Sequence, residues 1–202
     1  MIKKINKRHL SWILRSIPNV LWPLKIWITR SSLKSVGKNF RFGPNCSFYD
    51  HKLISVGNNV FFSDGCVIGA TVKVTIGNDV MFGPQVMIRG GDHNFSKVGY
   101  KMNKVKEGGV NLPVEIEDDV WVGARCTILK GVQICEGAVI GAGSLVTRRV
   151  LPYTVNVGLP SKTIRSRFTA NELRLHLSAV QTKYSFEEVA SMYDEQGINW
   201  RS

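Results

Sequence analysis

The 202-residue sequence lacks the long apolar run that a membrane-spanning helix requires. The most apolar stretch near the N-terminus, from Leu10 to Leu33, is interrupted by Arg15 and Lys25, which leave nine uncharged residues between them. A transmembrane helix needs roughly 20 apolar residues. No small-x-small cleavage site follows Arg15, so a cleaved signal peptide is not expected either. We therefore expect a cytoplasmic protein.

Acidic residues are absent from the first 41 residues, which contain ten Lys and Arg residues. Of the formal net charge of +12, the remaining 161 residues carry only +2. The basic segment also contains Trp12, Trp22 and Trp27, and such a segment, when helical, can rest at an anionic membrane surface. The alternative is a helix that packs its tryptophans on the body of the protein. No recognition motif accompanies the charge, so nucleic-acid binding is not expected.

The sequence also lacks a C-x-x-C pair, although it contains four cysteines. A cytoplasmic chain keeps its thiols reduced, so we expect neither a disulfide framework nor a metal site. Glycine does not recur at every third position, which excludes a collagen-like chain. At this length, with 44% hydrophobic residues, the chain can form one well-buried domain and is too short for two full-sized ones.

What the sequence does contain is a six-residue repeat. From Val36 the blocks are VGKNFR, FGPNCS, VGNNVF, FSDGCV, IGATVK, IGNDVM, FGPQVM and IRGGDH. From Ile116 they are IEDDVW, VGARCT, ILKGVQ, ICEGAV, IGAGSL and VTRRVL. An aliphatic residue or Phe opens most blocks, and the fifth residue is usually Val, Cys, Ala or Ser. Neither helical periodicity nor simple strand alternation produces a six-residue period.

This repeat predicts a triangular coil in which each block supplies one short strand and one corner. Three blocks make one turn, so 18 residues separate stacked positions, and stacked strands pair at about 4.8 Å. The first and fifth residues of a block point inward. Cys46, Cys66 and Cys126 occupy the fifth position and are expected to act as small buried hydrophobes, whereas Cys135 occupies the second position and is expected to be more exposed.

The repeat is interrupted at three places. Two shifts of register, at Ile54-Ser55 and Val74-Thr75, are expected to be small corner bulges. Residues 94–113 lack the repeat altogether, and a loop of this length inside a compact domain tends to be functional or disordered. The repeat fades after Val150, and the stretch from Ala170 to Asn199 predicts one or two short helices that close the open end of the coil.

These observations predict three parts: a basic aromatic helical segment over residues 1–35, the coil with its excursion over residues 36–166, and a helical cap over residues 167–202.

With this pattern of repeats, the sequence resembles the hexapeptide-repeat acyltransferases. The resemblance is to the maltose, galactoside and xenobiotic acetyltransferases and the capsule or O-antigen O-acetyltransferases in particular. The resemblance covers about residues 36 to 166 and depends on the repeat blocks and on four motifs: IGNDV with the excursion after it, IEDDVWVGA, VIGAGSLVTR and GLPSKTIR. It implies an all-β, left-handed parallel β-helix. It also implies a homotrimer with active sites between subunits, acetyl-coenzyme A lying along the coils, and direct transfer without an acetyl-enzyme.

His93 is the expected general base. A histidine, with an ordinary pKa near 6.5, can take the proton of a hydroxyl at neutral pH. His93 ends the block IRGGDH, where the excursion leaves the coil, and it matches the family's catalytic position. The preceding glycines permit a sharp exit of the backbone. Asp92 falls by block counting at an inward position, and we expect it to have a structural role rather than to orient His93.

The donor site follows from the resemblance. It implies that backbone amides at Gly123-Ala124 face the oxyanion of the thioester. Ala124 and Ala142 match the residues that contact pantetheine, and Trp121 either walls the thioester channel or packs between subunits. Thr147 and Arg148 match the residues at the adenine end, and Lys162 and Arg165 match the basic residues that bind the coenzyme phosphates.

Acceptor recognition departs from the galactoside enzymes, because Ser63, beside Asp64, stands where those enzymes place an acceptor-binding asparagine. A different sugar acceptor is therefore expected. The best fit is an O-acetyltransferase of cell-surface polysaccharide, such as capsule or O-antigen. The N-terminal segment would bring it to the inner membrane face.

Four alternatives remain open. The closest is N-acetylation of an amino sugar on a nucleotide carrier, which has the same fold. A serine-specific member lacks support, because the large helical N-terminal domain expected there is missing. A zinc carbonic anhydrase needs three histidine ligands, and only His51 and His93 lie within the repeats. A non-catalytic solenoid would leave the excursion at His93 unexplained.

Overall fold

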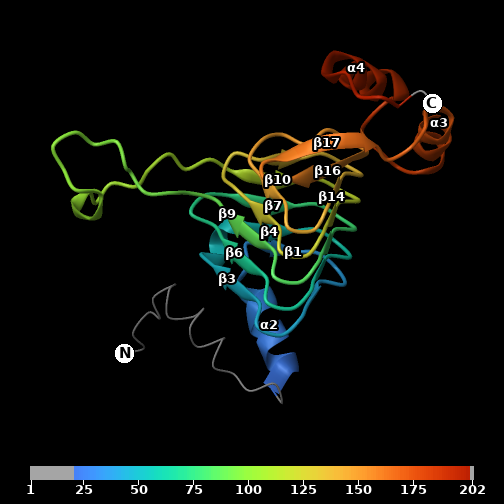
Figure 1. Cartoon of the computed structure of the whole chain (residues 1–202). Helices are drawn as coiled ribbons and strands as arrows, with labels where there is room; N and C mark the ends of the chain where they lie inside the picture. The colour runs from blue at the N-terminus through green and yellow to red at the C-terminus, as the bar shows by residue number, and fades with distance from the viewer. Residues whose placement is uncertain (1–20, 201–202) are drawn as a thin grey trace.

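The structure is a computed structural model that describes residues 21–200. The first 20 residues of the predicted N-terminal helical segment, with Trp12 and His9, lie outside the described residues. Within residues 21–200 the chain forms a parallel β-solenoid of about six turns, with one helix at its narrow end and two helices beyond its other end (Figure 1). The fold is the predicted left-handed β-helix with helical termini.

Three sheets form the faces of a triangular prism. Sheet A contains β1 (Ser35–Val36), β4 (Ile54–Val56), β7 (Val74–Ile76), β10 (Val114–Ile116) and β13 (Gln133–Ile134). Sheet B contains β2 (Arg41–Phe42), β5 (Phe61–Phe62), β8 (Met81–Phe82), β11 (Trp121–Val122), β14 (Val139–Ile140), β16 (Thr154–Gly158) and β17 (Ser161–Ser166). Sheet C contains β3 (Ser47–Tyr49), β6 (Val67–Gly69), β9 (Met87–Arg89), β12 (Thr127–Ile128) and β15 (Leu145–Val146). Each coil runs from A to B to C, and we name the corners A–B, B–C and C–A after the sheets they join.

Neighbouring strands in these sheets are parallel, except for β16 and β17, which form an antiparallel hairpin at the last coil. The spacing between stacked residues is 18 in the upper coils, as predicted, where Glu115 pairs with Gln133. In the lower coils the spacing is 20, and Ser35 pairs with Ser55. Each coil thereby supplies hydrogen-bond partners for the strands of the next one.

The two extra residues per lower coil lie elsewhere than predicted. Ile54 and Val74 are fully buried strand residues, so no bulge forms at Ile54-Ser55 or Val74-Thr75. The extra length is taken up just before them, at the C–A corner, where the 3-10 helix η2 (His51–Leu53) occupies one coil. Inward hydrophobic side chains hold the strands in register, and the corner absorbs the insertion.

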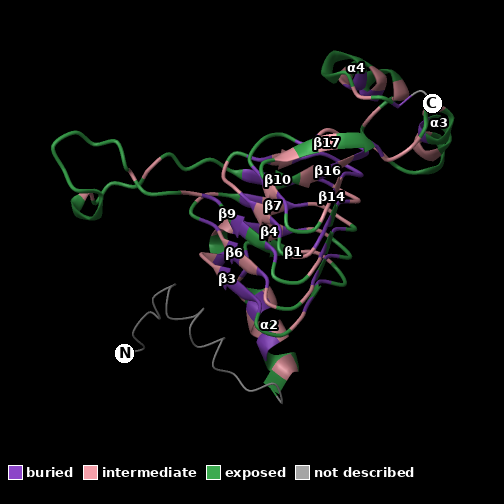
Figure 2. Ribbon diagram, viewed as in Figure 1, coloured by how far each residue is buried: buried purple, intermediate pink, exposed green. Residues whose placement is uncertain are grey.

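The prism is filled by the residues that open the blocks and by the fifth residues, and Figure 2 shows buried residues concentrated along the coils. Phe42, Phe62 and Phe82 stack up the inside of sheet B, with the rings of Phe62 and Phe82 parallel at 4.3 Å between centroids. The thiols of Cys46 and Cys126 are buried and donate hydrogen bonds to carbonyl oxygens of the next coil, Ser63 O at 3.0 Å and Gly141 O at 3.1 Å. These cysteines behave as the predicted small hydrophobes with a satisfied weak donor.

The prediction for Cys135 was wrong, because its exposed fraction is 0%. Its position in the repeat does face outward from the coil, but the segment after α3 lies over it, and Tyr184 interacts with the thiol. Burial raises the pKa of the Cys135 thiol. The six-residue pattern describes only what faces the inside of the prism, and it carries no information about what covers the outside.

The helix α2 (Trp22–Ser32) closes the narrow end of the prism. Proline in its first turn suits a helix start, where the missing N–H costs nothing. Trp22 packs edge-on against Phe42, with 5.3 Å between ring centroids, whereas Trp27 is 65% exposed. One tryptophan therefore packs on the body, and another is presented to the outside. Among the helices of the described residues, none is long and apolar enough to cross a membrane.

Two helices form the cap, α3 (Ala170–Ala179) and α4 (Phe186–Gln196). Each begins with a capping box, from Thr169 to Glu172 and from Ser185 to Glu188, which satisfies the free N–H groups of the first turn. The cap has its own small core, formed by Tyr153, Leu173, Val189, Tyr193 and Trp200. Tyr153 belongs to the corner after the last coil, so this second core attaches the cap to the prism.

Candidate functional site

His93 lies where the chain leaves the prism at the C–A corner. Strand β9 ends at Arg89, and Gly90 still donates to the carbonyl of Gly69 in the coil below at 2.9 Å. The chain then turns outward, and His93 pairs with Gly108 in a single antiparallel bridge. Residues 94–113, which we call the arm, project far from the prism and carry the short helix η3 (Met102–Lys104) (Figure 1). His93 is exposed and stands at the base of this arm.

The other described histidines are less suited to take a proton from a substrate. His51 is buried in η2 under α2, and burial lowers its pKa. His176 is half-buried in α3, and its ring lies between Phe168 and Tyr153, at 4.7 and 5.5 Å between centroids. His93 is thus the exposed histidine among those that the structure describes.

Asp92 does not occupy the inward position that block counting gave it. Its side chain is on the outside, where the carboxylate forms an ion pair with Lys130. The register is therefore lost before the end of the block IRGGDH, because the chain has already left the prism at Gly91. The structural role expected of Asp92 stays a prediction, and its observed contact is the ion pair with Lys130.

The B–C corner carries a column of small residues and available amide groups. Ala124 and Ala142 lie at equivalent points of two successive coils, and Gly143 N donates to Ala124 O at 2.8 Å. Neither Ala124 nor Ala142 uses its own N–H in a hydrogen bond within the described part of the chain. Gly123 N, by contrast, donates to Ile140 O at 2.7 Å. Of the predicted oxyanion pair Gly123-Ala124, only Ala124 therefore has an amide available for a ligand.

Ser63 and Asp64 lie at the same B–C corner, in a lower coil. Asp64 occupies the position equivalent to Ala124, and it also has an N–H without a partner among the described residues. The structure thus places four of the predicted site residues along one edge of the prism: Ser63, Asp64, Ala124 and Ala142.

Trp121 projects from the outer face of sheet B. It pairs in register with Met81 on one side and Val139 on the other, and Met81 pairs with Phe61. Trp121 and Met81 are each 52% exposed. These side chains form an exposed apolar stripe that runs along the prism beside the B–C corner, and Trp121 lies three residues before Ala124.

One residue predicted for the adenine end of the coenzyme and one predicted for its phosphates meet at the upper end of the prism. Arg148 and Lys162 line one pocket of about 590 Å³, together with Arg149 and the cap residues 196–199. Thr147 is exposed beside Arg148 at the C–A corner. Arg165 lies on β17 and donates to the carbonyl of its neighbour Ser166 at 2.9 Å, outside the lining of this pocket. The contribution of the cap to this pocket was missed by sequence reasoning, because no motif in residues 167–202 indicates it.

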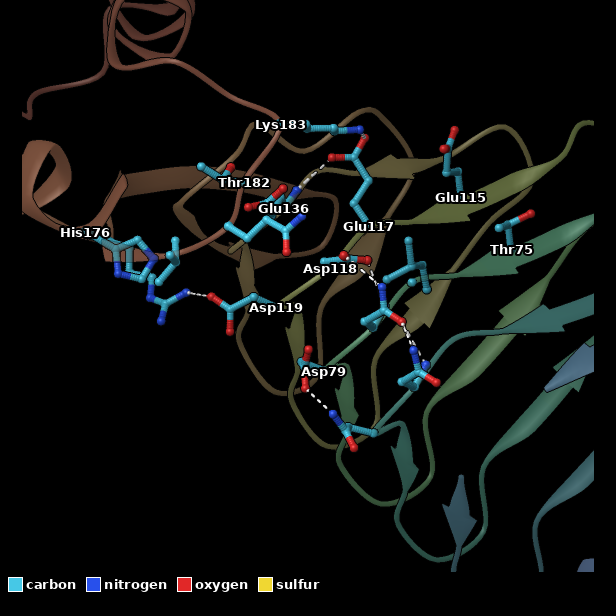
Figure 3. A pocket seen from close by; sticks show the side chains of 18 residues that line it. Thr75, Asp79, Glu115, Glu117, Asp118, Asp119, Glu136, His176, Thr182 and Lys183 are labelled. Atoms are coloured by element: carbon cyan, nitrogen blue, oxygen red, sulfur yellow. Dashed lines mark hydrogen bonds and ion pairs between the residues drawn. The ribbon is translucent and has the colours of Figure 1, made fainter. Parts of the chain in front are cut away.

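A larger cleft, of about 890 Å³, lies at the A–B corner against the cap and is acidic (Figure 3). Two of its carboxylates attach the cap to the prism. Glu117 binds Lys183 at 2.7 Å, and Asp119 binds Arg167 at 2.6 Å. His93 does not line this cleft. We therefore interpret it as the junction between cap and prism rather than as the catalytic centre.

No group of three or more His, Cys, Asp or Glu residues within residues 21–200 is arranged to hold a metal ion. The candidate site consists instead of two separate parts. His93 stands at the C–A corner, and the amides of Ala124 and Ala142 stand at the B–C corner, on the other side of sheet C. Sheet C, with the outward side chains of β9 and β12, separates the two parts within one chain.

Comparisons with known proteins agree with this architecture. A family model described as hexapeptide repeat of succinyl-transferase matches residues 113–148. A maltose O-acetyltransferase from Clostridium difficile 630 is 30% identical, with a TM-score of 0.70 and coverage of 79% of this chain and 83% of that one. A hexapeptide-repeat acetyltransferase from Vibrio cholerae O1 biovar eltor, solved with acetyl coenzyme A, is 25% identical, with a TM-score of 0.67 and coverage of 79% and 84%.

A chloramphenicol acetyltransferase from Klebsiella aerogenes is 42% identical over 74 residues, which are 37% of this chain and 35% of that protein. The chain thus spans about a third of the length of such curated relatives. The maltose O-acetyltransferase structure matches over most of its length, and the chain belongs to the hexapeptide-repeat acetyltransferase family.

Proposed function

We propose that this protein is an acetyl-coenzyme A-dependent O-acetyltransferase that acts on a sugar hydroxyl, with His93 as general base. The observation that carries the proposal is the position of His93, an exposed histidine at the base of the arm. An imidazole held there by a backbone bridge can receive a proton from a bound hydroxyl. The match to a maltose O-acetyltransferase supports a sugar acceptor.

The donor is acetyl-coenzyme A, bound along the B–C corner. The free amides of Ala124 and Ala142 are one coil apart, about 4.8 Å, so Ala142 N–H can donate a hydrogen bond to the extended pantetheine chain while Ala124 N–H faces the thioester. Arg148 and Lys162 supply positive charge for the phosphates at the upper end. Structural relatives solved with acetyl coenzyme A or coenzyme A support this donor.

The transfer then takes place in the following steps at these residues. The acceptor oxygen attacks the thioester carbonyl carbon while His93 takes the hydroxyl proton. The tetrahedral oxyanion accepts a hydrogen bond from Ala124 N–H. Collapse of the intermediate breaks the carbon–sulfur bond, and His93 returns the proton to the departing thiolate.

We further propose that the working molecule is a homotrimer in which His93 of one copy faces the B–C corner of its neighbour. The two halves of the site lie on different corners of one prism, so a second copy completes it. The exposed stripe of Phe61, Met81 and Trp121 would be covered at this contact. A ring of three copies is the simplest closed arrangement that repeats such a head-to-tail interface without leaving it open.

The acceptor we propose is a glycan of cell-surface polysaccharide, such as capsule or O-antigen. Ser63 and Asp64 lie on the donor corner below Ala124, where they can hydrogen-bond sugar hydroxyls. The alternative acceptor is a nucleotide-linked amino sugar, which would be acetylated on nitrogen. A panel of glycans and amino-sugar nucleotides, assayed for release of coenzyme A thiol with His93→Ala as control, separates the two. Equal release by wild type and His93→Ala would refute the catalytic assignment.

The proposed location is the cytoplasm, at the inner membrane face. Trp27 is exposed on α2 and Arg30 follows it on the same helix, within the basic segment of the sequence. We expect the full-length protein to co-sediment with anionic vesicles at low salt, and Trp27→Ala to weaken this binding. A wild-type protein that stays wholly in the supernatant would remove this part of the proposal.

A further inference from the structure

The base of the arm is held together by one lysine of the prism. Lys130 follows β12, and Ile128 of that strand pairs with Ile88 of β9, so Lys130 lies one coil above the start of the arm. Its ammonium group forms an ion pair with Asp92 on the outgoing limb and donates to the carbonyl of Val110 on the returning limb at 2.7 Å. A single side chain therefore ties both limbs to the coil.

The backbone around this lysine supports the same contact. Gly131 N donates to Pro113 O at 3.1 Å, and Gly109 N donates to Asp92 O at 3.3 Å. The limbs are so close that a Cβ at Gly109 would lie 2.6 Å from the carbonyl oxygen of His93. His93 thus sits in a short two-stranded ribbon whose free end is the arm and whose fixed end is Lys130.

We propose that Lys130 is a positioning residue for the acetyl transfer, acting on His93 through Asp92 and Val110. This inference rests on the proposed function, because it needs His93 as the base. Lys130 fixes the backbone direction from which the imidazole leaves the prism, and it neutralises the carboxylate of Asp92, the residue before His93. The two side chains are 26% and 32% exposed, so solvent screens this pair less than it screens pairs on the arm itself.

The arm offers a matched control. Lys97 and Glu107 form a second ion pair across the same two limbs, at 3.1 Å, but farther from the prism. Their side chains are 37% and 66% exposed, and neither residue contacts Asp92 or Val110 in the described structure. Loss of this pair removes a cross-arm contact without changing the base of the arm.

The test compares Lys130→Met, Lys130→Arg and Lys97→Met in the full-length protein, with steady-state kinetics for acetyl-coenzyme A and the pH profile of kcat. For Lys130→Met we expect kcat to fall by about 10- to 100-fold, since small misplacement of a catalytic group has effects of this size. KM for acetyl-coenzyme A should stay within about twofold, because the donor corner is untouched. The uncompensated Asp92 carboxylate should move the acidic limb of the profile to higher pH.

Lys130→Arg should recover most of kcat, because a guanidinium can still bind both Asp92 and Val110 O, and Lys97→Met should match wild type. Wild-type kcat and pH profile in Lys130→Met, with His93→Ala inactive, would overturn the inference and leave the proposed function intact. Should Lys130→Met not fold, Asp92→Asn removes the same ion pair, and wild-type kinetics in that variant would overturn the inference equally. Full activity in His93→Ala would instead refute the proposed function itself.

Discussion

Neighbouring glycines at the base of the arm differ in the space around them, and this difference allows a test of how tightly His93 must be held. A Cβ at Gly109 would lie 2.0 Å from Asp92 Oδ1 and 2.6 Å from His93 O. A Cβ at Gly108 would meet only Asn111 Nδ2, at 3.4 Å.

We expect Gly109→Ala to push the His93 backbone aside and to lower kcat by about 100-fold, whereas Gly108→Ala should stay within about threefold of wild type. Both substitutions lie on an exposed segment, so the midpoint of thermal unfolding should change little. Steady-state kinetics and thermal melts of the two variants check this. Equal kcat in the two variants would mean that the geometry of this bridge does not matter for catalysis.

The free amide of Ala142 can be removed by a proline substitution. Pro44 and Pro84 occupy the equivalent corner position in other coils, so the backbone there already accepts proline. We expect Ala142→Pro to fold normally but to raise KM for acetyl-coenzyme A by about 5- to 10-fold, because one hydrogen bond worth about 1 kcal/mol is lost. Ala142→Ser keeps the amide and serves as the control. An unchanged KM in the proline variant would mean that Ala142 N–H does not bind the pantetheine chain.

Sequence reasoning located these site residues unevenly. His93 was predicted because a histidine coincided with the end of the repeat, and Ala124 and Ala142 were predicted through motif position; the structure describes where they lie, and their roles stay predictions. Lys130 was missed, since a lysine in the block ILKGVQ looks like a solvated corner residue until the arm folds back over it. A contact between residues 38 positions apart through an irregular arm leaves no periodic signal.

Among the elements, the strands could be predicted from the blocks because every coil must place apolar side chains at the same inward positions of a narrow prism. The outward positions carry no such repeated requirement. The burial of Cys135 and the docking of the cap therefore could not be predicted. Glu117 is the centre of that docking. Its carboxylate accepts hydrogen bonds from Gln133 Nε2 at 2.8 Å, Glu136 N at 2.9 Å and Tyr184 OH at 3.0 Å, besides its ion pair with Lys183.

We expect Glu117→Ala to lower the free energy of unfolding by about 3 kcal/mol, since it leaves buried donors without their acceptor. Lys183→Met should cost less than about 1 kcal/mol, because the lysine is half exposed and its loss leaves Glu117 with three donors. Chemical denaturation measures both values, and hydrogen exchange should rise first in residues 180–185. A similar decrease in the free energy of unfolding in the two variants would mean that Glu117 is not the main residue that holds the cap on the prism.

In the whole molecule, the two halves of the candidate site lie on opposite sides of sheet C, so the proposed mechanism requires two copies to meet. A variant without the base and a variant without the donor corner are therefore expected to complement each other. The base variant is His93→Ala. The donor-corner variant is Ala124→Pro combined with Ala142→Pro, assayed at low acetyl-coenzyme A, where weak donor binding abolishes most activity.

This shared site is tested by the rate of coenzyme A release from mixed trimers of the two variants, co-expressed with different tags and purified through both. If His93 of one copy works on the donor corner of another, every mixed trimer has one site of its three with an intact base and an intact corner, and activity should return to about one third of wild type. If His93 instead works on the donor corner of its own chain, every site lacks one half, and mixed oligomers as inactive as the separate variants would contradict the account.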